Sequence, residues 1–199
     1  MTQVVLVRHG ATAWTGHRYC GRSDPPLDAA GLAAVAALAA SLAPTLPAHV
    51  WIVSSPARRA RQTAAAIAGA VGLGDADVLI DDRWIEADCG IAEGRTFDDL
   101  AALVPDLAAA LARGEPAIDW PGGETAAALV ARVEAAWDDV IARAVPTVVV
   151  SHAGPLRHAL GLALARPPMP AEWLEPATAA RVDIVRHQAD SETVLRSLA

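Results

Sequence analysis

Three short valine-rich runs constrain the fold of this chain more than any other feature of its sequence. They cover residues 4–7, 50–53 and 147–150. Polar residues do not alternate with apolar ones inside these runs, so each predicts a strand that is buried on both faces. Further short strands are expected at residues 78–80, 181–185 and 193–198.

Alanine-rich segments that favour helices lie between the predicted strands. We expect Asp28 to cap a helix over residues 29–42. Ser55 is expected to cap a second helix, which Pro56 begins and which continues to about residue 71. The remaining helices are expected at residues 96–103, 105–111, 124–144 and 155–165.

Strands that alternate with helices indicate an α/β fold. The expected architecture is a three-layer sandwich, in which a mostly parallel central sheet carries helices on both faces. Neither an internal repeat nor a linker divides the sequence, so residues 1–199 are expected to form a single domain.

Composition narrows the classes of partner and location. The net charge of -7 argues against nucleic acid or an anionic membrane as a partner, although a local arginine cluster could still bind a small anion. The two cysteines, Cys20 and Cys89, are too few for a disulfide framework. Together with the lack of an apolar leader after Met1, they predict a cytoplasmic protein.

Polar side chains of one kind follow three of the predicted strands. Arg8 and His9 end the first, the pair Arg58 and Arg59 comes shortly after the second, and His152 ends a later one. Because parallel strands end at the same edge of a sheet, these groups are expected to converge. Two histidines beside arginines favour a catalytic site for an anionic group, whereas the first strand end alone is equally compatible with a polar turn.

These residues also carry a family resemblance. The segment VRHGAT at residues 7–12 resembles the RHG signature of the histidine phosphatase superfamily, also called the phosphoglycerate mutase-like family. The chain looks like the compact bacterial branch, which includes α-ribazole phosphatase. The other matching segments, in order, are GRSDPPL (21–27), SSPARRARQT (54–63), WIE (84–86) with Gly90, Glu93 and Gly94, PGGET (121–125) and VSHAG (150–154).

The resemblance implies a phosphoglycerate mutase-like fold and a role for each matching residue. His9 is implied to be the nucleophile, forming a phosphohistidine with one ring nitrogen while the other donates to a backbone carbonyl. Arg8, Arg59 and His152 are implied to stabilise charge on the transferred phosphoryl group. Arg59 is preferred to Arg58 because the family's arginine precedes an Ala-x-x-Thr stretch.

Glu86 is implied to be the general acid, with a solvated loop carboxylate as the alternative interpretation. The matching loops place five substrate-binding residues, namely Thr15, Cys20, Gly21, Arg22 and Ala153. Cys20 is interpreted as a small loop residue and not as a nucleophile. The resemblance requires neither a cofactor nor a metal ion, because the arginines supply the positive charge.

The expected activity is metal-independent hydrolysis of a small phosphorylated metabolite, such as α-ribazole phosphate or a sugar phosphate. Three alternatives remain: a phosphoglycerate mutase, a catalytically silent module that binds a phosphorylated ligand, and a zinc hydrolase. The segment of residues 84–94, which contains Glu86, resembles the acid loop of this family. Mutases of the family usually carry a longer insertion beyond the acid loop, and only 37 positions separate Glu86 from Gly123. The oligomeric state is left open between monomer and homodimer.

Overall fold

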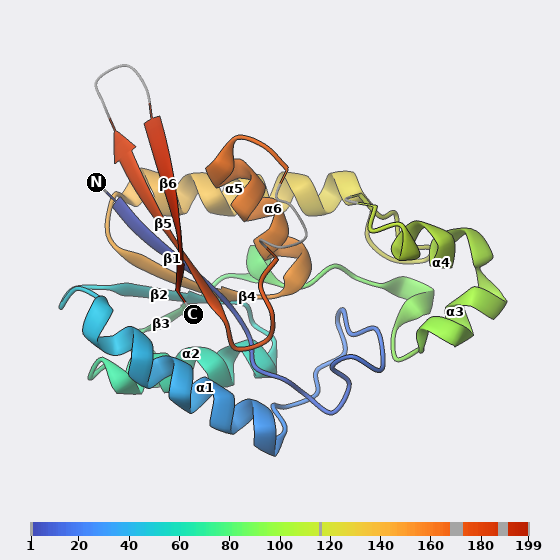
Figure 1. Ribbon diagram of the computed structural model, residues 1–199, viewed down its shortest axis with the longest axis horizontal. Helices are drawn as coiled ribbons and strands as arrows, with labels where there is room; N and C mark the ends of the chain where they lie inside the picture. The colour runs from blue at the N-terminus through green and yellow to red at the C-terminus, as the bar shows by residue number, and fades with distance from the viewer. Residues whose placement is uncertain (1, 116, 168–172, 187–190, 199) are drawn as a thin grey trace.

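The computed structural model describes residues 2–115, 117–167, 173–186 and 191–198, and the side chains as far as residue 183. In this part of the chain the centre of the fold is a sheet with strand order β3-β2-β4-β1-β5-β6 (Figure 1). Its strands are β1 (Thr2–Arg8), β2 (Trp51–Ser54), β3 (Val78–Ile80), β4 (Thr147–Ser151), β5 (Ala179–Arg186) and β6 (Ser191–Leu198).

Most of the sheet is parallel. β4 pairs in parallel with both β1 and β2, and β2 pairs in parallel with β3. β5 and β6 extend the β1 edge as antiparallel strands. The predicted α/β fold with a mostly parallel sheet is therefore confirmed.

Helices cover both faces of the sheet (Figure 1). α1 and α2 lie on one face, and α5 and α6 lie on the other. The α-helices are α1 (Ala29–Leu42), α2 (Arg58–Ala70), α3 (Phe97–Leu103), α4 (Pro105–Ala112), α5 (Ala126–Arg143) and α6 (Ala153–Leu164). Short 3-10 turns occupy Ala43–Thr45, Asp75–Asp77, Asp82–Trp84 and Gly90–Ala92.

The first valine-rich run explains this layering. Val4 and Leu6 point into the core formed with α5 and α6, whereas Val5 and Val7 point into the core formed with α1 and α2. All four side chains are completely buried. An uninterrupted apolar run is needed because alternate side chains of a strand face opposite sides, and here both sides are covered.

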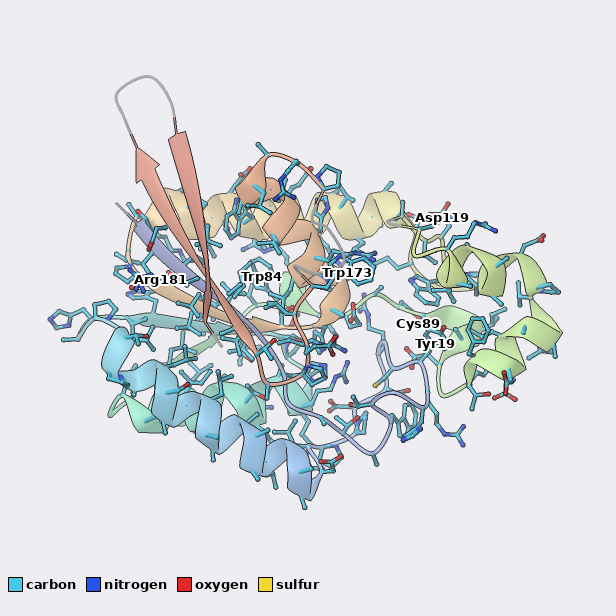
Figure 2. All side chains as sticks on the ribbon, in the orientation of Figure 1. Tyr19, Trp84, Cys89, Asp119, Trp173 and Arg181 are labelled. Atoms are coloured by element: carbon cyan, nitrogen blue, oxygen red, sulfur yellow. The ribbon has the colours of Figure 1, made fainter. Side chains whose placement is uncertain are left out.

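α3 and α4 lie to one side of the sheet and form a small core of their own (Figure 1). Leu100, Leu107 and Ala108 pack there against Cys89, and Tyr19 packs against the same cluster (Figure 2). The long loop after β1 therefore contacts the segment that follows Glu86.

The structure confirms some of the expected caps and element ends and corrects others: β5 and β6, for example, each begin two residues before their expected starts. The Asp28 side chain caps α1 as expected. Ser55 does not cap the second helix: Ala57 precedes α2, which begins at Arg58, and no side chain caps it. α6 begins at Ala153, two residues before the expected Pro155. Among the described residues, no helix is both long and apolar enough to cross a membrane.

Candidate active site

His9 lies at the end of β1, where its side chain is 8% exposed. Its Nδ1 lies 2.7 Å from the carbonyl oxygen of Gly10, and its Nε2 accepts a hydrogen bond of 3.3 Å from Nε of Arg59. Since Nε2 accepts, the proton of the neutral ring is on Nδ1, where it is donated to the carbonyl. A contact between one ring nitrogen and a backbone carbonyl was expected. The single lone pair of Nε2 accepts from Arg59 here, so it must leave this hydrogen bond before it can bind another group.

The surroundings of His9 keep its imidazole neutral. Burial, followed by the charge of Arg59, lowers the pKa of His9 from 6.5 to about 3; the Gly10 bond opposes this shift, and Arg8 adds to it. At neutral pH the ring is therefore neutral, with Nε2 unprotonated, which is the form that can act as a nucleophile.

Arg59 is held in a fixed position on α2. It is 1% exposed, and its guanidinium donates to the carbonyl oxygens of Ser23 at 2.7 Å and Gly21 at 3.0 Å as well as to His9. The neighbouring Arg58 is exposed, and its backbone N–H donates to Asp24. Of the two arginines, Arg59 is therefore the one that faces His9.

His152 lies beside His9, with ring centroids 4.9 Å apart, and is completely buried. Its Nε2 lies 2.7 Å from Oγ of Ser55, which also accepts from the N–H of Ala57 at 3.3 Å. The hydroxyl predicted to cap a helix thus contacts a histidine of the site. Burial, then the neighbouring His9 and arginines, lowers the pKa of His152 well below its usual value.

Two buried nitrogen atoms at the site lack a hydrogen-bond partner among the described residues. They are Nε of Arg8 and Nδ1 of His152, which carries the ring proton when the Ser55 hydroxyl donates to Nε2. Arg8 uses another nitrogen, Nη1, to donate to the carbonyl of Leu174 at 2.9 Å. Buried donors without partners are rare, and oxygens of a bound anion could satisfy both.

Glu86 follows the 3-10 turn Asp82–Trp84 and is half-buried. Its Oε1 accepts from the N–H of Ala87 at 2.9 Å, and its Oε2 accepts from the N–H of Gly154, in the first turn of α6, at 3.4 Å. A Cβ atom on Gly154 would lie 2.5 Å from Oε1, so a larger residue at this position would displace the Glu86 carboxyl group. Burial lowers the pKa of Arg8, whereas the nearby Glu86 and Glu175 act to raise it.

The predicted substrate-binding residues are placed differently from one another. The carbonyls of Cys20 and Gly21 accept from Arg59, and Nε of Arg22 donates to the carbonyl of Glu86 at 3.1 Å. Ala153 is exposed at the start of α6. The Thr15 hydroxyl contacts Thr12 within its own turn, so the structure does not place it against His9. Burial, the largest of several effects, raises the pKa of the Cys20 thiol.

Sequence reasoning missed two residues that join the parts of the site. The Thr63 hydroxyl donates to the carbonyl of Arg59 at 2.9 Å and accepts from the N–H of Gly10 at 3.2 Å. Glu93 accepts from the backbone N–H groups of residues 22 and 23. Both lie within the quoted motifs, but nothing in the sequence identifies which backbone groups they bind. Within the described part of the chain, no group of three or more His, Cys, Asp or Glu side chains is arranged so that it could hold a metal ion.

Comparison with known proteins gives a family and several relatives. A model of the histidine phosphatase superfamily (branch 1) matches residues 4–198. The bifunctional protein Rv2228c of Mycobacterium tuberculosis is 37% identical over 166 residues, which cover 82% of this chain and 44% of that protein. A probable phosphoglycerate mutase GpmB from Enterobacter sp. is 38% identical over 145 residues, covering 71% of this chain and 64% of that protein. The chain spans less than two thirds of the length of either relative.

Solved structures resemble the whole fold. A mycobacterial glucosyl-3-phosphoglycerate phosphatase in complex with VO3 has a TM-score of 0.84 at 26% identity, covering 100% of this chain and 99% of that one. TTHB049 from Thermus thermophilus has a TM-score of 0.68 at 30% identity, covering 92% and 94%. An Escherichia coli structure named for alpha-ribazole-5'-P phosphatase has a TM-score of 0.80 at 24% identity, covering 100% and 96%, and this likeness concerns the fold alone.

Proposed function

Because the chain belongs to the histidine phosphatase superfamily (branch 1), we propose that it is a metal-independent phosphomonoester hydrolase that acts through a phosphohistidine. One observation carries the proposal: the neutral imidazole of His9 has its unprotonated Nε2 beside Arg59, and Nε of Arg8 and Nδ1 of the neighbouring His152 are buried without a hydrogen-bond partner among the described residues. A phosphoryl group would bring an electrophilic phosphorus to the nucleophile and oxygens to the donors.

In the first step the lone pair of His9 Nε2 leaves its hydrogen bond with Nε of Arg59 and attacks phosphorus, and the bond from phosphorus to the ester oxygen breaks. The protonated carboxyl of Glu86 gives its proton to the departing alkoxide, which leaves as an alcohol. Arg8 and Arg59, with the Nδ1–H of His152, stabilise charge on the non-bridging oxygens. The Gly10 carbonyl supports the step because it accepts from Nδ1 and stabilises the ring as positive charge develops on it.

In the second step a water molecule attacks the phosphorus of the phosphohistidine. The carboxylate of Glu86 takes one proton from this water, the bond between nitrogen and phosphorus breaks, and inorganic phosphate leaves. His9 returns to its neutral form, and Glu86 is again protonated. The same carboxyl group thus serves as acid and then as base, and each step balances without a metal ion.

The proposed substrate is a phosphomonoester of a small metabolite, such as a sugar phosphate or an α-ribazole phosphate-like compound. The name of the mycobacterial structural relative, a glucosyl-3-phosphoglycerate phosphatase, supports this class. The net charge of -7 supports the absence of nucleic acid or anionic membrane as a partner. A cytoplasmic location and a monomeric or homodimeric state stay predictions.

A phosphoglycerate mutase is the alternative, and the GpmB relatives favour it. A mutase must return the phosphoryl group to a second hydroxyl of the substrate before water attacks the phosphohistidine. The two activities separate in one assay: a hydrolase releases inorganic phosphate from 3-phosphoglycerate or other monoesters, whereas a mutase converts 3-phosphoglycerate to 2-phosphoglycerate.

The proposal is tested by His9→Ala, assayed with p-nitrophenyl phosphate and a panel of metabolite monoesters. Loss of the covalent nucleophile is expected to lower kcat/KM by about a thousandfold or more. His49→Ala, at an exposed position, is the matched control and should retain full activity. Appreciable turnover by His9→Ala would overturn the mechanism, and loss of wild-type activity after EDTA treatment would overturn its metal independence. A wild-type chain that turns over no monoester would support the silent binding module instead.

A further inference from the structure

Two arginine side chains hold the backbone around Glu86 by hydrogen bonds to its carbonyl groups. Nη1 of Arg132, on α5, donates to the carbonyls of Arg83 at 2.7 Å and Ile85 at 2.6 Å. Nε of Arg22, from the loop after β1, donates to the carbonyl of Glu86 itself at 3.1 Å. Three carbonyls within four consecutive residues are therefore fixed by side chains from distant parts of the chain.

Arg132 is in turn held by Glu124, which lies just before α5. Nε of Arg132 is 2.7 Å from Oε1 of Glu124, and its Nη2 is 2.8 Å from Oε2. These side chains are only 16% and 10% exposed, respectively. Nη2 of Arg22 lies 3.7 Å from the same Oε2. Glu124 thus fixes the guanidinium of Arg132 at two points, which sets the direction of its other donors.

Glu124 is also tied to the segment that follows Glu86. Its backbone N–H donates to the carbonyl of Asp88 at 2.9 Å, and its Oε2 accepts from the N–H of Asp88 at 3.4 Å. Burial acts to raise the pKa of Glu124, but the hydrogen bonds and charge of Arg132, with Asp88 and Arg22, lower it. The carboxylate therefore stays ionised over the neutral range and keeps the ion pair intact.

We infer that Glu124 and Arg132 are positioning residues for Glu86. Their ion pair fixes the backbone of the acid loop on both sides of Glu86, so that the carboxyl reaches the leaving-group oxygen. This inference rests on the proposed function, in which Glu86 is the acid. Neither residue hydrogen-bonds to His9, His152, Arg8 or Arg59 in the described part of the chain, and the charge of Arg132 is the last of several effects on His152. The pair therefore acts mainly on proton delivery and leaves phosphoryl binding to the buried histidines and arginines.

The consequence depends on the leaving group. An alkyl phosphate leaves as a strongly basic alkoxide and needs the proton from Glu86, whereas p-nitrophenolate leaves with little help. The ratio of kcat/KM for an alkyl ester, glycerol 2-phosphate, to that for p-nitrophenyl phosphate therefore measures proton delivery. A loss of folded protein would lower both values equally and would not move this ratio.

The test compares Glu124→Gln and Arg132→Lys with the wild-type chain. Gln removes the charge at nearly constant shape, and Lys keeps the charge but cannot donate to both carbonyls and both carboxylate oxygens. We expect kcat/KM for the alkyl ester to fall by about 10- to 100-fold and that for the aryl ester by less than about threefold. The Kd for vanadate should stay within about threefold of wild type. Arg113→Gln, at the exposed Arg113–Glu115 pair, is the matched control and should change nothing.

The outcomes separate this inference from the proposed function. A wild-type chain that hydrolyses neither ester contradicts the proposed function itself. With an active wild type, an unchanged ratio in both variants overturns the positioning role. An equal loss for both esters with weakened vanadate binding, or failure of both variants to fold, overturns it as well, because the pair then maintains the fold and not the acid. If only Glu124→Gln fails to fold, the ratio of the two kcat/KM values measured for Arg132→Lys decides whether the pair positions Glu86.

Discussion

The two sides of the candidate site are built from different kinds of structure. On the phosphoryl side, His9 and His152 follow strand ends and Arg59 lies on a helix, and their exposures are 8%, 0% and 1%. On the leaving-group side, the loops before α1 and after β3 carry Arg22 and Glu86, and the Arg22 side chain is 41% exposed. Under the proposed function, we expect the buried sheet edge to carry out phosphoryl transfer and the loops to select the substrate.

The physical consequences of the two sides also differ. A buried sheet edge can keep two imidazoles neutral and direct several donors at one point, because the surrounding core prevents rearrangement. The loops are instead held by hydrogen bonds from a few side chains to the backbone, such as those from Arg22 to the Glu86 carbonyl and from Arg132 to the Ile85 carbonyl. Changes on the first side should therefore abolish turnover of every ester, and changes on the second should alter one substrate relative to another.

The largest expected effect in this comparison comes from Arg59→Lys. A lysine keeps the charge but cannot donate at once to Ser23, Gly21 and His9 as the guanidinium does. We expect kcat/KM to fall by about 10²- to 10³-fold for alkyl and aryl phosphates alike, since charge stabilisation on the phosphoryl group is lost for both. Arg58→Lys, at the exposed neighbour, is the control. An Arg59→Lys enzyme with near wild-type kcat/KM would contradict the contrast.

A second prediction concerns stability and pH. With a pKa of about 3 in the folded chain and 6.5 as its ordinary value, His9 is neutral when folded but protonated when unfolded between these limits. The unfolded state then binds more protons, so the free energy of unfolding falls as pH decreases through this window. The difference in the free energy of unfolding between the wild-type chain and His9→Asn should change by up to about 1.4 kcal/mol per pH unit for one proton. Urea unfolding of both proteins at pH 7, 6 and 5 measures this difference. A difference that stays constant over these pH values would refute the prediction.

The smallest effect is expected at Thr15, which lies in the loop before α1 on the leaving-group side of the site. Its hydroxyl accepts from the N–H of Thr12 at 2.9 Å and has no contact with His9 in this arrangement. Thr15→Val should therefore change kcat/KM for p-nitrophenyl phosphate by less than about threefold, while Thr15→Ser, which keeps the hydroxyl, should match wild type. A loss of 100-fold or more in Thr15→Val alone would show that the hydroxyl reaches the phosphoryl group after all.

The phosphoryl side could be anticipated from the sequence for a simple reason. Parallel strands end at one edge of the sheet, so the residues that follow β1 and β4 were expected to converge. In the structure these two strands are neighbours, and the ring centroids of His9 and His152 lie 4.9 Å apart. The choice of Arg59 over Arg58 comes instead from the family resemblance, in which the arginine precedes an Ala-x-x-Thr stretch. Helix geometry adds only that two adjacent side chains, about 100° apart, do not face the same point.

The supporting contacts could not be predicted in the same way. Ser55 has the position and chemistry of a helix cap, yet its hydroxyl contacts a histidine 97 positions away. Arg132 binds the carbonyl of a residue 47 positions away, and neither its periodicity nor its neighbours single it out. Such contacts depend on the path of irregular loops in space, which apolar patterns do not determine.

The central claim is that His9 becomes covalently phosphorylated, and the most direct measurement is detection of that species. The enzyme would be mixed with a ³²P-labelled monoester, quenched within milliseconds under alkaline conditions, and digested for peptide mapping. The account predicts label that is stable in alkali, labile in acid, located on the peptide containing His9 and absent from His9→Ala. Turnover of the ester with no labelled peptide at any quench time, or label on another residue, would contradict it.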